Sequence, residues 1–118
     1  MNSKVRNFIK GDNLDALYAN QLFLNDGPFW YRGFALDTEP EICQKVSKVL
    51  RSYKASRMVM GHTPQLDTGK ILSRCDGQIV VIDVGISHAY GGNLGALEIT
   101  RTIQEDGTFK ESVKNLYP

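Results

Sequence analysis

The sequence is poor in cysteine and has no long hydrophobic run, and each shortage excludes a class of protein. Its 118 residues contain two cysteines, Cys43 and Cys75, which match neither a zinc-ligand spacing nor a disulfide framework. We therefore expect two buried thiols in a reducing compartment. No stretch approaches the roughly 20 apolar residues of a membrane span, and residues 1–7 lack the apolar core of a secretion signal. These absences favour the cytoplasm and predict no membrane partner.

An excess of one charge is also lacking. Fourteen basic residues nearly balance thirteen acidic ones, and the net charge is +1. The basic residues are scattered rather than gathered in a stripe, so charge predicts no nucleic acid partner. With 42% hydrophobic and 23% charged residues, the composition is that of a globular protein. No repeat or low-complexity linker divides the chain, so we treat residues 1–118 as a single unit.

Two helices are predicted in the first half of the chain. Residues 12–24 have apolar positions at near-helical spacing, and a breaker follows at residues 25–28. The second helix begins after Thr38, an N-cap with Glu41 as its capping-box partner, and ends near Lys54. Five residues form its predicted apolar face: Ile42, Val46, Val49, Leu50 and Tyr53.

Strands are predicted in the second half. Five stretches have strand composition: 58–60, 71–75, 78–84, 95–103 and 108–115. Asp76-Gly77 is a strong two-residue hairpin signal, and Asp106-Gly107 is a second one. The order of two helices followed by strands predicts a mixed α/β or α+β fold.

The first chemistry-bearing segment is Gly61-His62-Thr63, directly after the predicted strand 58–60. Sites in sheet proteins gather at strand ends, where loops leave backbone and side chains open to a ligand. Gly61 permits a close turn, and His62 can present a neutral imidazole to a metal ion. An ordinary loop histidine explains the same residues.

The second segment is Phe29-Trp30-Tyr31-Arg32-Gly33. Arginine makes planar, forked contacts with phosphate oxygens that lysine cannot reproduce. The aromatic residues before Arg32 could hold its stem. The alternative is that the aromatics are core anchors and Arg32 is a surface charge.

The third segment, residues 82–92, is an apolar strand that runs into a glycine-spaced loop with Ser87, His88 and Tyr90. Adjacent residues on an extended chain point in opposite directions, so Ser87 and His88 do not form a nucleophile and its base. No helix N-terminus follows the glycines, which excludes a phosphate cradle. A ligand-approach loop and a simple turn between strands both remain open.

Taken in order, the three segments resemble the calcineurin-like metallophosphoesterases, most closely the bacterial-type (Shewanella-like) branch of phosphoprotein phosphatases. The motifs are Trp-Tyr-Arg-Gly at 30–33, Gly-His-Thr at 61–63 with Gln65, and Ile-Asp-Val-Gly-Ile-Ser at 82–87 before Ala-Tyr-Gly-Gly at 89–92. The resemblance spans residues 26–101 and depends on the order and spacing of the motifs together.

The resemblance implies a fold and a reaction. The fold would be the C-terminal half of a four-layer αββα sandwich, with two helices followed by mainly antiparallel strands. The complete family domain is a hydrolase of phosphomonoesters, here phosphoserine or phosphothreonine. It holds two divalent ions (Mn, Fe or Zn) bridged by a hydroxide that attacks phosphorus.

The resemblance also implies roles for single residues. His62 matches a histidine that ligates one metal ion, and Arg32 matches an arginine that clamps the substrate phosphate. Tyr90 matches the tyrosine of a loop that overhangs the cleft. Asp83 has a counterpart that we expect to be structural, whereas His88 has no family role and is expected at the surface.

Other family motifs are absent from the sequence: Gly-Asp-x-His-Gly, Gly-Asp-x-x-Asp-Arg-Gly and Gly-Asn-His-Glu. One histidine cannot hold two metal ions, since each needs about four to six ligands. We therefore expect the C-terminal part of such a domain, inactive alone and without tightly bound metal, whose partner is the missing N-terminal half or a second copy. A non-catalytic partner-binding domain and an unrelated α/β domain are the alternatives.

Overall fold

The computed structural model describes residues 21–24 and 27–118. The chain divides into two compact units, Met1–Arg32 and Gly33–Pro118, which we consider separately. The helix predicted over residues 12–24 lies largely outside the described residues, and its last four residues form a turn. The treatment of residues 1–118 as one unit stays a prediction.

The second unit begins with two helices, a short α3 (Gly33–Leu36), which the sequence did not predict, and a long α4 (Glu39–Tyr53). Thr38 is the N-cap of α4, as predicted. Its hydroxyl lies 3.5 Å from the Glu41 carboxylate and makes no hydrogen bond to the helix backbone. Lys54 ends the helix in a left-handed conformation with φ of 50°, where a glycine is the commoner residue.

One face of α4 is buried, and it is narrower than predicted. Ile42, Val46 and Leu50 are buried and form the centre of the core. Val49 and Tyr53 were predicted on this face, but they are 38% and 80% exposed. Successive helical residues are about 100° apart, so Val49 lies beside the buried stripe, and Tyr53 is the last residue of the helix.

The strands next along the chain form a three-stranded sheet in the order β1-β3-β2. They are β1 (Met58–Met60), β2 (Leu72–Arg74) and β3 (Ile79–Val81). β1 pairs with β3 in parallel and β2 pairs with β3 antiparallel. The predicted two-residue turn at Asp76-Gly77 is part of a four-residue connection, because Arg74 pairs with Ile79.

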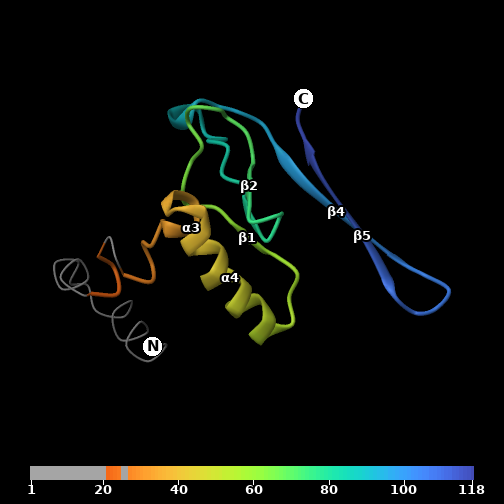
Figure 1. Cartoon of the computed structure of the whole chain (residues 1–118). Coiled ribbons are helices and arrows are strands. Elements are labelled where there is room, and N and C mark those ends of the chain that lie inside the picture. Colours follow the sequence, from red (N-terminus) through yellow and green to blue (C-terminus); the bar gives the residue numbers. More distant parts are fainter. Residues whose placement is uncertain (1–20, 25–26) are drawn as a thin grey trace, which may run out of the picture. The chain divides into compact units, whose positions relative to one another are not determined.

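A hairpin of β4 (Ala96–Ile103) and β5 (Phe109–Leu116) follows, close to the predicted strands (Figure 1). Its base packs on the sheet: Leu97 contacts the cluster of Ile71, Val80 and Val84. The opposite face of the sheet packs against α4 through Ile79 and Val81. The second unit is therefore layered, with a helix on one face of the sheet and a hairpin on the other.

Cys43 and Cys75 form a disulfide, and the prediction of two separate thiols was wrong. Their Cα atoms are 5.4 Å apart, within the usual range for a disulfide. The separation of 32 residues along the chain does not prevent pairing, because α4 packs directly over the strand β2, after which Cys75 lies. No helix among residues 21–24 and 27–118 is long and apolar enough to cross a membrane.

The fold is thus mixed α/β, as the order of elements predicted. Its strands include one parallel pair, β1 with β3, beside two antiparallel pairs. This parallel pair positions the segments that carry His62 and Asp83.

Candidate functional site

His62 and Asp83 leave the same edge of the sheet. Met60 and Val81 are paired at the last position of the parallel strands, and the Ile82 amide donates to the Met60 carbonyl at 2.8 Å. Each of His62 and Asp83 is two residues beyond a member of that pair. Because parallel strands end at a common edge, the two segments that carry them emerge side by side.

One hydrogen bond joins these two segments beyond the sheet, and others hold each segment in shape. The Gln65 amide donates to the Asp83 carbonyl at 2.9 Å, and the Gln65 side-chain amide donates to the Thr63 carbonyl at 2.8 Å. Thr63 is buried. One oxygen of the Asp83 carboxylate accepts the Gly85 amide at 3.3 Å, a turn-forming contact. Asp83 therefore shapes its own loop, the structural role expected of it.

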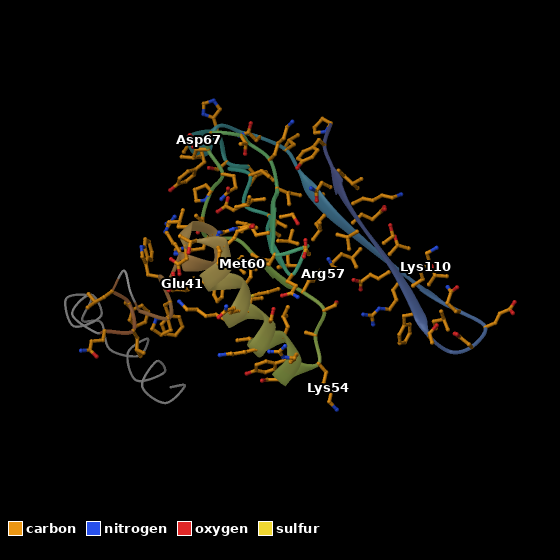
Figure 2. The ribbon with its side chains drawn as sticks, viewed as in Figure 1. Glu41, Lys54, Arg57, Met60, Asp67 and Lys110 are labelled. Atoms are coloured by element: carbon orange, nitrogen blue, oxygen red, sulfur yellow. A yellow bond between two sulfur atoms is a disulfide. The ribbon has the colours of Figure 1, made fainter. Side chains whose placement is uncertain are left out.

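His62 stands at the surface in a left-handed backbone conformation, with φ of 68°. Such a conformation is uncommon for a residue other than glycine, and it is found in turns and at functional sites. The loop that contains Asp67 continues from His62 and lies at the end of the sheet away from Arg57 (Figure 2). The imidazole is accordingly at a position that a ligand could approach.

Tyr90 lies in a compact loop that closes on the end of β3. It ends a 3₁₀ turn, η1 (His88–Tyr90), and is 54% exposed. The Asn93 amide donates to the Gly85 carbonyl at 3.2 Å, and the Asn93 side chain donates to the Val84 carbonyl at 3.0 Å. These bonds fix the loop from both ends, and the exposed ring of Tyr90 is free to contact a ligand. His88 is exposed in the same turn, as predicted.

Gly85 is required where Tyr90 crosses the chain. Its φ is 76°, and a Cβ at this position would lie 2.3 Å from the Tyr90 carbonyl oxygen. Real Cβ atoms do not approach backbone oxygen so closely, so any side chain would move the loop. Position 85 of the Ile-Asp-Val-Gly motif therefore needs glycine both because a side chain would clash with Tyr90 and because its φ is positive.

Arg32 belongs to the first unit, Met1–Arg32. Its guanidinium carbon lies 5.4 Å from the centroid of the Trp30 ring, a cation–π contact. Phe29 stacks on Phe23 with ring centroids 4.9 Å apart. Trp30 is 45% exposed, which does not fit a core anchor. Trp30 therefore contacts the Arg32 guanidinium, whereas the convergence of Arg32 with His62 and Tyr90 stays a prediction.

The residues that the structure describes do not form a metal centre by themselves. Across residues 21–24 and 27–118, no group of three or more His, Cys, Asp or Glu side chains is arranged to hold a metal ion. His62 has a surface imidazole of the kind that ligates divalent ions, and it fits one ligand position. The described part of this chain does not fit a complete binuclear site.

Arg74 is a residue that the sequence reading missed. Its side chain is 9% exposed and donates from Nη1 to the Phe34 carbonyl at 2.9 Å and from Nη2 to the Asp37 carbonyl. Phe34 lies within α3 and Asp37 directly follows it. The first residue of α3, Gly33, directly follows Arg32. Nothing in the local sequence signals this contact, since it joins residues 37 and 40 positions apart.

Comparison with known proteins identifies a longer relative. Over 84 residues the chain is 40% identical to the uncharacterized protein C1840.07c of Schizosaccharomyces pombe. The matched segment is 71% of this chain and 25% of that protein, so the chain spans about a quarter of the length of the relative it matches. No family model and no solved structure matches the chain. The resemblance to metallophosphoesterases therefore stays a prediction from its motifs.

Proposed function

We propose that this chain is the C-terminal part of a calcineurin-like, metal-dependent phosphatase that hydrolyses phosphomonoesters, with phosphoserine and phosphothreonine in proteins as substrates. The observation that carries the proposal is the placement of His62 at the common edge of β1 and β3, beside the loops of Asp83 and Tyr90. Exposed side chains at the ends of parallel strands are a usual place for a site in an α/β protein.

The side chains have separate roles in this proposal. His62 supplies one imidazole ligand to one of two divalent ions (Mn, Fe or Zn), whose remaining ligands come from outside the described residues. When bound, such ions would activate a water molecule as the nucleophile for phosphorus. Arg32 orients the phosphate through forked hydrogen bonds, and Trp30 steadies its guanidinium. Tyr90 covers the substrate from its exposed turn.

The finer fold belongs to the same proposal. The layers of α4, the three-stranded sheet and the hairpin are compatible with part of a four-layer αββα sandwich. Val59 of β1 is 41% exposed, although Val80, its register partner on the same face, is 2% exposed. Among the described strands β1 has only β3 as a neighbour. An apolar, unpaired edge of this kind fits association with the missing N-terminal half or a second copy.

The test is hydrolysis of p-nitrophenyl phosphate and of a phosphoserine peptide by the intact gene product that contains this chain, with added Mn²⁺. We expect His62→Ala to lower kcat/KM by ~100-fold or more, since even residues that only support a metal ligand contribute about 10- to 100-fold. His88→Ala is the matched control, because His88 is exposed and has no assigned role.

Two results would reject the proposal. Equal activity of the His62→Ala and wild-type proteins would remove His62 from the site. No metal-dependent hydrolysis by a folded intact protein would favour the non-catalytic, partner-binding alternative. The exposed apolar residues of the hairpin, Ile103 and Phe109, are the observation on which that alternative would then depend.

A further inference from the structure

The Cys43–Cys75 disulfide borders an open pocket of about 440 Å³. One side of each cysteine packs against the core cluster around α4. The other side lines the pocket, together with five residues from α4 and the β2–β3 connection: Glu39, Pro40, Ser47, Asp76 and Gln78. Both cysteines are half-buried. A pocket of this volume is large enough for a small thiol such as glutathione to enter.

The disulfide and Arg74 are neighbouring anchors for one stretch of chain. Cys75 ties the second turn of α4 to the β2–β3 connection. Arg74 binds the Phe34 and Asp37 carbonyls, and its Nε lies 3.7 Å from the Glu39 carboxylate. Residues 33–43 are thus held to two consecutive residues, Arg74 at the end of β2 and Cys75 at the start of the β2–β3 connection.

The backbone conformation of Cys75 and Asp76 favours movement of this turn away from α4 once the disulfide is reduced. Cys75 and Asp76 both have left-handed backbones, with φ of 53° and 52°. A non-glycine residue adopts this conformation only at a cost in free energy. The apolar contacts of Ile42, Val46 and Leu50 do not depend on the disulfide. Reduction should therefore loosen residues 33–43 without unfolding the unit.

We propose that the Cys43–Cys75 disulfide is a reversible redox latch, attacked by small thiols through this pocket, that fixes residues 33–43. The latch itself is inferred from these contacts alone. A consequence of the latch for phosphate binding by Arg32, which precedes Gly33 in the chain, rests on the proposed phosphatase function.

The exchange is a two-step transfer with a thiol as reductant. A thiolate attacks one protein sulfur, forms a mixed disulfide and releases the other cysteine as a thiolate, which takes a proton from water. A second thiolate attacks the mixed disulfide at the sulfur of the small molecule. Two protein thiols and one oxidised small-molecule disulfide result, and two electrons pass to the protein.

The first experiment incubates the full chain in glutathione buffers of graded redox ratio, followed by alkylation and mass spectrometry. We expect reversible conversion of the native, folded chain. Hydrogen exchange should then rise ~10-fold or more in residues 33–43 on reduction, with no change in residues 96–116. The Cys43→Ser/Cys75→Ser double variant is the control and should show the faster exchange in every buffer.

The second experiment tests the route of attack with Asp76→Asn. Asparagine tolerates the left-handed conformation, so the turn is preserved. Removing the carboxylate should raise the rate with anionic glutathione relative to cationic cysteamine by about two- to fivefold, as expected for one charge at close range in water.

The outcomes separate the latch from the phosphatase proposal, because neither readout uses activity. Reversible reduction of the native chain with faster exchange in residues 33–43 supports the latch. A disulfide that glutathione reduces only in denaturant overturns it. Unchanged exchange after reduction, or an unchanged rate ratio in Asp76→Asn, also overturns it.

Discussion

Met60 and Val81 are paired at the last position of two parallel strands, and this pairing brings the chain segments of His62 and Asp83 to one edge of the sheet. The relationship explains why motifs 21 positions apart in the sequence can act together. It does not require either residue to contact the other. The loops are held instead by the bond from the Gln65 amide to the Asp83 carbonyl.

Substitution of Gly85 should disrupt the Tyr90 loop. Gly85→Ala places a Cβ 2.3 Å from the Tyr90 carbonyl at a φ of 76°, and we expect it to lower the free energy of unfolding by about 2–4 kcal/mol. Gly107→Ala is a matched control, because Gly107 has a φ of 79° but nothing within 4 Å of the added Cβ. Its cost should be ~1 kcal/mol, that of the backbone conformation alone.

Urea unfolding followed by circular dichroism measures both glycine variants. A cost for Gly85→Ala no larger than that for Gly107→Ala would show that the contact with Tyr90 is not formed. A larger cost confined to Gly85→Ala would confirm the close approach of the two chain segments.

Attachment of the hairpin to the sheet should depend on pH through Glu111. A hydrogen bond from Arg57 is the largest cause that lowers the pKa of Glu111, and Arg57 and Arg101 add favourable charge. Because folding lowers this pKa, the pair stabilises the folded state above the unfolded pKa, about 4.3. That contribution is lost as the pH falls through the folded pKa.

The pKa of Glu111 can be read from the NMR shifts of its side-chain carboxyl carbon. We expect a titration midpoint below the unfolded value of about 4.3. Glu111→Gln should remove the corresponding loss of stability below about pH 4. A Glu111 midpoint at or above the unfolded value would contradict the ion pair with Arg57.

Loss of Arg74 should loosen α3 more than a surface change would. Arg74→Lys keeps the charge but cannot reach two carbonyls as a fork, so we expect a cost of about 1.5–3 kcal/mol in unfolding free energy. Arg51→Lys, at an exposed position of α4, should cost less than about 0.5 kcal/mol. Equal costs for the two variants would mean that the Arg74 contacts do not stabilise the fold.

The sequence predicted those elements whose signals are local. The bounds of α4 and of β4 and β5 follow from a cap, apolar periodicity and turn residues, and they agree with the structure to within a residue or two. The disulfide and the Arg74 contacts could not be predicted, because they depend on which elements pack together. Tyr53 was misplaced because helical periodicity does not show where the supporting sheet ends.

For the candidate site, sequence reasoning located His62 and Tyr90 at a strand end and in a glycine-rich loop, where the structure has them. It did not show that β1 and β3 are parallel, which is what brings their loops to one edge. Arg32 lies in the other unit, and its convergence with His62 stays a prediction.

The central claim is that His62 ligates a metal ion in the assembled phosphatase. The chain has only two histidines, His62 and His88, so each serves as a control for the other. The direct measurement is NMR line broadening of the two imidazole signals when substoichiometric Mn²⁺ is added to the intact gene product. We predict that the His62 signal broadens beyond detection at a lower Mn²⁺ concentration than the His88 signal, because paramagnetic broadening falls steeply with distance from the ion. Equal broadening of both signals at every Mn²⁺ concentration, or none at His62, would contradict the claim.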